Sequence, residues 1–299
     1  MSMVESKAVE GIAQPDALED ELPALSGQVT TIRPASRVPH LDFAELWKYR
    51  ELAATFAWRD LKVRYKQSLI GVAWAILQPV MTMIVFTFIF GTFAHVPSQG
   101  LPYPVFSYSG ILPWTYFASA LGAASASLAM NSTLVTKIYF PRVLLPAAAI
   151  TVPAVDFLLA CSVLAGLMFW YGLSVGPHAL LAPVFMLLAA ATAFGVGLIF
   201  AVINVRYRDV PYAIPFIIQI WLFLSPVIYP IKALHQGWEK LILSLNPMSG
   251  VITGFRWSLL GTPPPGAVQL TLSSIAALAF LGFGLALFRS YEPRFADTI

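Results

Sequence analysis

Residues that could carry out catalysis or bind a metal are few in this chain and lie far apart. The four histidines are scattered, and the single cysteine, Cys161, lies in an apolar run, so no internal disulfide can form. The chain contains no G-x-x-x-x-G-K-[ST] loop that could cradle the phosphates of a nucleotide. We therefore predict no catalytic residue, no metal site and no cofactor bound by this chain. Any energy from ATP would have to come through another polypeptide.

Asp156 is the only Asp, Glu, Lys or Arg that falls deep inside one of the long apolar segments of the sequence. An ionisable side chain in such a position is a candidate functional residue. Thr151, Ser162 and helix-end backbone groups also offer it structural partners. A single acid is a poor basis for a carrier driven by protons or sodium ions, which commonly uses relays or discontinuous helices. The sequence favours a packing role for Asp156 and leaves a direct role in transport open.

The elements that must position these residues are those of an integral membrane protein. Between Gln67 and Thr136 the chain carries no Lys, Arg, Asp or Glu, a run of about seventy residues. One membrane-crossing helix needs only roughly 20 apolar residues. Charged residues make up 11% of the chain, against about 25% in a typical soluble domain. The N-terminus has no basic region followed by an apolar one, so no signal peptide is expected.

Hydropathy predicts an all-α membrane protein with six transmembrane helices. The predicted spans are residues 70–93, 105–129, 146–170, 179–203, 211–230 and 268–288. Lys and Arg gather before the first span and after the second, fourth and sixth, whereas the hairpins after the first and third spans contain none. Because short cytoplasmic loops carry the excess of Lys and Arg, both termini are predicted to be cytoplasmic.

Four regions are expected along the chain. They are a disordered cytoplasmic segment at 1–41, an amphipathic helix at 42–66, the transmembrane domain at 67–290 and a cytoplasmic tail at 291–299. In the second region one helical face holds Phe43, Trp47, Ala54, Trp58, Leu61 and Tyr65, flanked by Lys48, Arg59, Lys62 and Lys66. This pattern favours a helix lying in the membrane interface, with packing on a partner protein as the alternative.

The segment between the last two spans contains two short apolar helices around a break. Residues 238–245 and 248–259 each show helical spacing of apolar side chains, and Asn246-Pro247 separates them. Each piece is too short to cross a membrane. We expect a re-entrant or interfacial hairpin, which is tolerated where protein or water covers its exposed backbone.

Aromatic residues make up 13% of the chain, and many sit near the outer ends of spans. The interfacial aromatic belt explains most of them, but aromatic faces also suit sugar rings. The residues predicted to line a substrate path are Trp74, Tyr108, Trp114, Tyr116, Phe117 and Arg256. A lipid-facing role for any one of these aromatics remains the alternative.

Several motifs, in order and spacing, resemble the ABC-2 type permeases that export polysaccharides such as O-antigen, capsule and teichoic acid. These motifs are Trp58-Arg-Asp-Leu-Lys-Val-Arg-Tyr-Lys66 with Leu69-Ile-Gly-Val-Ala-Trp74, Lys137-Ile-Tyr-Phe-Pro-Arg142, Arg208-Asp-Val210, Ser225-Pro-Val-Ile-Tyr-Pro230 and Leu245-Asn-Pro-Met248 with Phe255-Arg256. The resemblance covers about residues 42 to 290 and leaves the first forty residues outside.

The resemblance implies a homodimeric pore in the bacterial inner membrane, with two cytoplasmic ATPase subunits that bind Mg-ATP. It implies contacts with a lipid-linked glycan and membrane lipid, and no nucleic-acid partner. The loop that couples to the ATPase would contain Lys137, Ile138, Tyr139, Phe140, Pro141 and Arg142. The cytoplasmic gate and interface would contain Trp58, Arg59, Asp60, Lys62, Arg64, Tyr65, Lys66, Arg206, Arg208 and Asp209.

These expectations predict the membrane subunit of an ATP-driven exporter of a lipid-linked polysaccharide, with O-antigen as the first candidate. Three alternatives remain open. One is an ABC-2 exporter of another substrate, such as teichoic acid, capsule, a drug or a lipid. Another is a membrane enzyme acting on lipid-linked sugars, for which Asp60, Asp209 and Glu239 are the candidate acids near the surface. The last is a membrane scaffold without transport activity.

Overall fold

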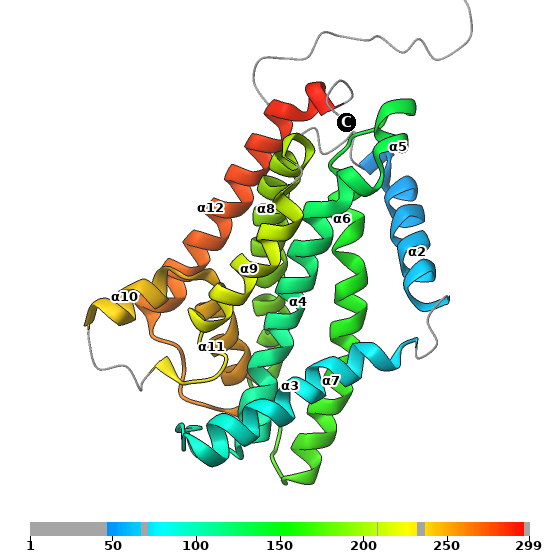
Figure 1. The fold of residues 1–299 in the computed structure, drawn as a ribbon. Coiled ribbons are helices and arrows are strands. Elements are labelled where there is room, and N and C mark those ends of the chain that lie inside the picture. Colours follow the sequence, from blue (N-terminus) through cyan, green and yellow to red (C-terminus); the bar gives the residue numbers. More distant parts are fainter. Residues whose placement is uncertain (1–46, 67–70, 208, 232–236, 296–299) are drawn as a thin grey trace, which may run out of the picture. The chain divides into compact units, whose positions relative to one another are not determined.

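The computed structural model describes residues 47–66, 71–207, 209–231 and 237–295, and these residues are helical with short connections. The helices are α2 (Arg50–Lys66), α3 (Ala73–Phe86), η2 (Thr87–Phe93), α4 (Tyr103–Met130), α5 (Ser132–Lys137), α6 (Leu144–Ala149), α7 (Thr151–Trp170), η3 (Ala179–Leu181), α8 (Ala182–Arg206), α9 (Val210–Phe223), α10 (Gly237–Leu245), α11 (Pro247–Leu260), α12 (Ala267–Tyr291) and η5 (Glu292–Arg294). Figure 1 shows their arrangement. The region predicted to be disordered, 1–41, lies outside the described residues.

Each of the six predicted spans overlaps one or two helices, and four stretches of the described chain are long and apolar enough to cross a membrane. These stretches are Ala73–Phe93, Leu144–Trp170, Ala179–Arg206 and Ala267–Arg294. The fifth predicted span, 211–230, is largely α9, which has 14 residues and ends at Phe223. The predicted all-helical membrane fold is therefore confirmed for the described residues.

Helix α4 forms the centre of the bundle. It has 28 residues, and nearly every side chain from Val105 to Leu128 is buried or half-buried. It packs against α3, α6, α7, α8 and α11, and the hydroxyl of Tyr108 donates a 3.0 Å hydrogen bond to the carbonyl of Ala160 in α7. Small residues let its neighbours come close, since a Cβ on Gly197 of α8 would lie 2.6 Å from the Cβ of Ala124.

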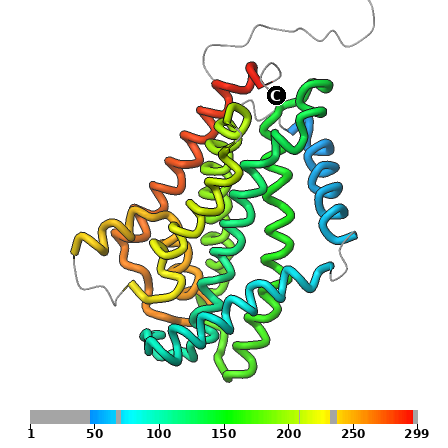
Figure 2. The backbone as a smooth tube through the Cα atoms, viewed as in Figure 1, coloured from blue at the N-terminus to red at the C-terminus, as the bar shows by residue number. Residues whose placement is uncertain are grey.

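Helices α8 and α12 run side by side, and their contact depends on two glycines (Figure 2). A Cβ on Gly284 would overlap the carbonyl oxygen of Gly195. Backbone meets backbone at this crossing, so no side-chain rotation could relieve the overlap. This is the kind of small-residue contact that holds membrane helices together.

The segments predicted to be cytoplasmic gather at one end of the helical bundle. Phe56 of α2, Phe140 after α5 and Phe288 of α12 belong to one buried cluster, together with Phe295 near the end of the described chain. The hairpin before α4 and the segment after α9 lie at the other end, where the hydroxyl of Tyr103 donates to the carbonyl of Ile228 at 3.0 Å. This arrangement agrees with the alternation of Lys and Arg along the sequence.

The two short helices expected before the last span are present as α10 and α11. Asn246 caps α11 by accepting a 3.0 Å hydrogen bond from the amide of Met248. The apolar face of α10 is exposed at Trp238 and Leu241, whereas Met248 and Val251 of α11 are fully buried. The break at Asn246-Pro247 therefore separates an outward-facing helix from a core helix.

Candidate functional site

A polar cleft of about 240 Å³ opens between α3, α4 and α7, beside the end of α2. Its polar lining residues are Arg64, Gln78, Thr82, Thr115, Ser119 and Asp156. Trp114 and Tyr116 also line it. The cleft therefore brings one residue of the predicted gate, Arg64, together with two aromatics predicted to line a substrate path.

Asp156 lies in the wall of this cleft and is held by two side chains of α2. Its Oδ2 atom lies 2.5 Å from Nη2 of Arg64, and its Oδ1 atom accepts a 2.5 Å hydrogen bond from the hydroxyl of Tyr65. Burial, followed by the hydrogen bond to Asp156, raises the pKa of Tyr65, so this hydroxyl stays protonated and donates.

The structure corrects the partners expected for Asp156 from the sequence. The hydroxyl of Thr151 donates to the carbonyl of Ala148, and the hydroxyl of Ser162 donates to the carbonyl of Leu159. Both hydroxyls therefore bond within or next to their own helix. The actual partners, Arg64 and Tyr65, come from α2, far away in the sequence.

Helix α2 packs with the face opposite to its predicted aromatic stripe. Phe56 is buried, while Trp47 and Trp58 are 70% and 60% exposed. Phe56 lies nine residues after Trp47, half a turn away at 100° per residue. The Arg50 guanidinium and the Lys62 ammonium lie over the exposed Trp47 and Trp58 rings at 5.3 and 5.4 Å. Trp47 and Trp58 of the stripe thus remain available for a membrane surface or a partner, whereas Tyr65 of the same stripe is bonded to Asp156.

Helix α2 also follows the direction of α6 and α7. Phe56 contacts Phe140, just before α6, whereas Arg64 reaches Asp156 in the second turn of α7. The last turns of α2, with Lys62, Arg64 and Lys66, therefore lie beside the first turns of α7, within the predicted third span. Charges at such a depth are tolerated where they are paired or face a polar cavity; Arg64 pairs with Asp156 and lines the polar cleft.

The loop expected to dock on an ATPase divides into exposed and buried residues. Lys137, Ile138 and Tyr139 are exposed, with Tyr139 at 86%. Phe140 is only 4% exposed, and Pro141 is buried as well. The guanidinium of Arg142 donates to the carbonyl of Glu292, and the Arg142 amide donates to the Glu292 carboxylate at 2.7 Å. The structure therefore leaves residues 137–139 as the accessible part of this loop.

The remaining predicted gate residues lie apart from the cleft. Arg59 pairs with Asp60 at 2.7 Å and also donates to the side chain of Asn131 at 3.0 Å, next to the loop at 132–142. Arg206 and Asp209 are exposed around the turn between α8 and α9, and Arg208 lies outside the described residues.

The aromatics predicted to line a substrate path lie mostly in the core of the helical bundle. Tyr108 and Phe117 have no exposed surface, and Trp114 and Tyr116 are each 6% exposed. Trp74, at the start of α3, is 52% exposed. The ring of Phe117 packs edge-on against Trp221 of α9 at 5.0 Å. In this conformation Trp114 and Tyr116 reach the polar cleft, whereas Tyr108 and Phe117 hold helices together.

Arg256 was expected in the same set, but the structure places it at a junction of three chain segments. Its guanidinium donates to the carbonyls of Phe106, Pro226 and Val227 at 2.5 to 3.2 Å, and it lies 3.8 Å from the centre of the Phe106 ring. The side chain is 2% exposed. Arg256 thus joins α11 to the start of α4 and to the turn after α9.

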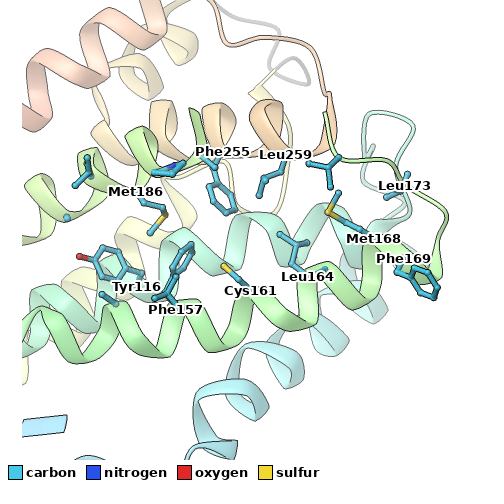
Figure 3. A pocket seen from close by; sticks show the side chains of 18 residues that line it. Tyr116, Phe157, Cys161, Leu164, Met168, Phe169, Leu173, Met186, Phe255 and Leu259 are labelled. Carbon is cyan, nitrogen blue, oxygen red and sulfur yellow. The ribbon is translucent and has the colours of Figure 1, made fainter. Parts of the chain in front are cut away.

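A larger groove of about 800 Å³ runs between α7 and α8 and was not anticipated from the sequence (Figure 3). Its walls include Phe157, Cys161 and Met168 on α7 and Met186 on α8, and Phe255 of α11 faces into it. Among the described residues that line it there is no Asp, Glu, Lys or Arg. This apolar lining suits hydrocarbon chains and makes the groove a poor path for a hydrophilic polymer.

One sequence pattern that is typical of a catalytic serine occurs here in a different structural setting. Gly172-Leu-Ser-Val-Gly176 matches the G-x-S-x-G pattern of a nucleophile elbow, which requires a turn from strand to helix. Here it follows helix α7, and the described residues contain no strand. In the same described part of the chain, no group of three or more His, Cys, Asp and Glu side chains could hold a metal ion.

The chain matches known proteins over most of its length. A model of the ABC-2 type transporter family matches residues 51–260. The O-antigen export system permease protein RfbA of Myxococcus xanthus is 29% identical over 257 residues, covering 85% of this chain and 98% of that protein. The protein of the same name from Klebsiella pneumoniae is 27% identical over 247 residues, or 81% and 92% of the two chains.

A further relative is the polysialic acid transport protein KpsM of Escherichia coli, which is 25% identical over 241 residues, covering 78% of this chain and 91% of that protein. The family match runs from the start of α2 to the end of α11 and takes up more than half of the chain. With its bundle of apolar helices, this multi-pass membrane protein belongs to the ABC-2 type transporter family.

Proposed function

We propose that this chain is the membrane subunit of an ATP-driven exporter that moves a lipid-linked polysaccharide across a bacterial inner membrane, with O-antigen as the first candidate. The observation that carries the proposal is the similarity to the O-antigen export permease of Myxococcus xanthus, which extends over 98% of that protein. The relative named for polysialic acid transport supports the same class of cargo, a long hydrophilic glycan.

The polar cleft is the proposed part of the path that belongs to this chain. A hydrophilic polymer needs a continuous hydrated route through the hydrocarbon, and the cleft offers hydroxyl, amide and charged groups beside Trp114 and Tyr116. At about 240 Å³ it holds a short stretch of sugar rather than a polymer. A second copy of this chain would complete the route. The exposed apolar faces of α3 and α9, at Met81, Phe88 and Phe216, offer surface for that contact or for lipid.

The energy for export would come from two cytoplasmic ATPase subunits that bind Mg-ATP. Lys137, Ile138 and Tyr139 form their proposed docking site, because these residues project from the described chain beside α5. Exposed aromatic residues are common anchors of small interfaces. Tyr139 replaces Phe140 as the proposed anchor, since Phe140 packs inside the chain.

The proposed membrane topology keeps six spans with both ends in the cytoplasm. Four of these spans are the stretches that meet the length and composition of a membrane-crossing helix, and α4 and α9 would be the other two. α10 and α11 would re-enter from the outer face, with the exposed apolar side of α10 toward lipid. α2 would stand at the cytoplasmic entrance, with Trp47 and Trp58 toward lipid headgroups and Arg64 toward the cleft.

The proposal is tested by deleting the gene from its host and following the surface polysaccharide. We expect the surface glycan to disappear and the lipid-linked glycan to accumulate inside the cell, and the wild-type gene to restore export. The affinity-tagged protein should copurify with an ATPase subunit.

The same experiment separates the alternatives. Normal surface glycan with a changed lipid composition or drug sensitivity would point to an ABC-2 exporter of another substrate. Loss of the lipid-linked glycan itself, rather than its accumulation, would point to a membrane enzyme. A protein that binds no ATPase and leaves all of these unchanged would be a scaffold, and the proposal would be wrong.

A further inference from the structure

Asp156 has a role in this fold that the sequence left open. Both of its carboxylate oxygens are engaged by α2, one by Arg64 and the other by Tyr65, at 2.5 Å each. The Asp156 side chain is 15% exposed and that of Arg64 is 48% exposed. One acid on α7 thus fixes the last turn of α2 through two adjacent side chains.

The middle of α2 is tied to the loop proposed to dock on the ATPase. The ring of Phe56 packs against that of Phe140 with centroids 5.6 Å apart, and Arg59 donates to the side chain of Asn131 at 3.0 Å. Since a helix is stiff along its axis, a displacement at Phe56 moves Arg64, two turns further on, as well. Helix α2 therefore connects the loop at 132–142 to the Asp156 contact.

The Asp156 contact forms part of the wall of the polar cleft. Arg64 and Asp156 both line this cleft, together with Thr115 and Ser119 of α4 and Gln78 of α3. When Arg64 stays on Asp156, the end of α2 remains against the cleft. When the contact breaks, Arg64 leaves that wall, and Tyr65 leaves Asp156 with it, because the two residues are adjacent in one helix.

We propose that Asp156 is a positioning residue that holds the end of α2 against the polar cleft, and that the cleft widens when Arg64 and Tyr65 leave its carboxylate. Movement of the docking loop reaches this contact through Phe140 and Phe56. The inference rests on the proposed function, since it assigns the cleft to the substrate path. In this proposal Asp156 acts through the position of α2.

The test measures how fast a thiol in the cleft reacts with a water-soluble reagent. The full-length protein, complexed with its ATPase, carries Cys161→Ala and Thr115→Cys. Asp156→Asn keeps the volume of the side chain and its ability to accept from Tyr65 but removes the ion pair. We expect labelling at position 115 to become several-fold faster in Asp156→Asn and in Arg64→Gln. The charge exchange of Arg64→Asp with Asp156→Arg should return it toward the starting rate.

Glu51→Gln is the matched control, because it removes an exposed carboxylate from the same helix far from the cleft. It should leave the labelling rate unchanged. A purely structural role would alter the melting temperature of Asp156→Asn without changing the labelling rate, and that result would overturn the inference.

Failure of the inference and failure of the proposed function remain distinguishable. Unchanged labelling in Asp156→Asn, in cells where the wild-type gene restores surface glycan, refutes only the role of Asp156. A wild-type gene that does not restore glycan export refutes the proposed function whatever the labelling rate.

Discussion

Phe140 packs its ring against Phe56 of α2, with the ring centroids 5.6 Å apart and the ring planes inclined by 59°. This contact turns the bulky residue of the loop at 132–142 inward and leaves its neighbour Tyr139 86% exposed. Adjacent aromatics in one loop are thus placed differently. Phe140 links the loop to α2, and Tyr139 is exposed at the surface of the described chain.

Tyr139→Ala should weaken binding of the ATPase subunit while leaving the fold intact. Truncating an aromatic anchor commonly costs about 2 kcal/mol of binding free energy, or roughly 30-fold in affinity. The measurement is the dissociation constant of the detergent-purified protein for its ATPase, together with the melting temperature of the membrane subunit alone. Unchanged affinity would remove Tyr139 from the docking site.

Phe140→Ala, in contrast to Tyr139→Ala, should mainly lower the stability of the membrane subunit rather than its affinity for the ATPase. Removing a buried Phe leaves a cavity and costs about 3–5 kcal/mol of folding free energy, so the isolated membrane subunit should melt at a clearly lower temperature. If Phe140→Ala melts like the wild type and loses only ATPase binding, then Phe140 itself is the anchor and the buried packing is not maintained in the complex.

Gly110→Ala should destabilise the junction around Arg256. A Cβ at position 110 would overlap the guanidinium of Arg256, which is held by three carbonyls and has no room to move. Overpacking of this kind costs about 1–3 kcal/mol. Gly122→Ala is the control on the same helix, because no atom of the described residues lies within 4 Å of its Cβ position. Thermal unfolding of the two variants should differ clearly, and equal melting temperatures would contradict the geometry of Arg256.

The crossing of α8 and α12 gives a second matched pair. Gly284→Ala would push a methyl group into the backbone of Gly195, whereas Gly282→Ala, one half-turn away, meets nothing within 4 Å. We expect Gly284→Ala to lower the melting temperature and the yield of folded protein, and Gly282→Ala to leave both unchanged. A Gly284→Ala variant as stable as the wild type would show that the two helices can separate at little cost.

The proposed topology is checked with single cysteines in a Cys161→Ala background. Ala94 and Ser174 are exposed in the two hairpins without Lys or Arg, and Thr133 is exposed in α5. An impermeant thiol reagent added to intact cells, with access to the outer face of the inner membrane, should label positions 94 and 174 and spare 133. Labelling of 133 with 94 and 174 protected would invert the topology.

The helices themselves could be predicted because a long charge-free run in a membrane must satisfy its own backbone hydrogen bonds, and a helix does so. The break at Asn246-Pro247 was also predictable, since the residue before proline disfavours helix. The fifth span is shorter than predicted because α9 ends at Phe223, before the turn at Ser225-Pro226. The third span is divided at Ile150 between α6 and α7.

The candidate site was harder to predict because its contacts join distant parts of the chain. Asp156 and Tyr65 are 91 residues apart, and nearby Thr151 and Ser162 looked like equally good partners. Aromatics occur on both faces of α2, so periodicity could not show that the Phe56 face packs inward. From the sequence, Arg256 was expected to line the substrate path. Its carbonyl partners, up to 150 residues away in the chain, show that it joins three chain segments instead.

Photo-crosslinking of glycan in transit tests the central claim most directly. A photoreactive amino acid is placed at Ser119, which is exposed in the polar cleft, or at Leu187, which is 70% exposed beside the apolar groove. During ATP-driven export of a labelled lipid-linked glycan, we predict adducts between protein and glycan at position 119 and none at 187. Adducts should be lost when the ATPase is inactivated. Continued export with no adduct at 119, or with equal adducts at 187, would contradict the account.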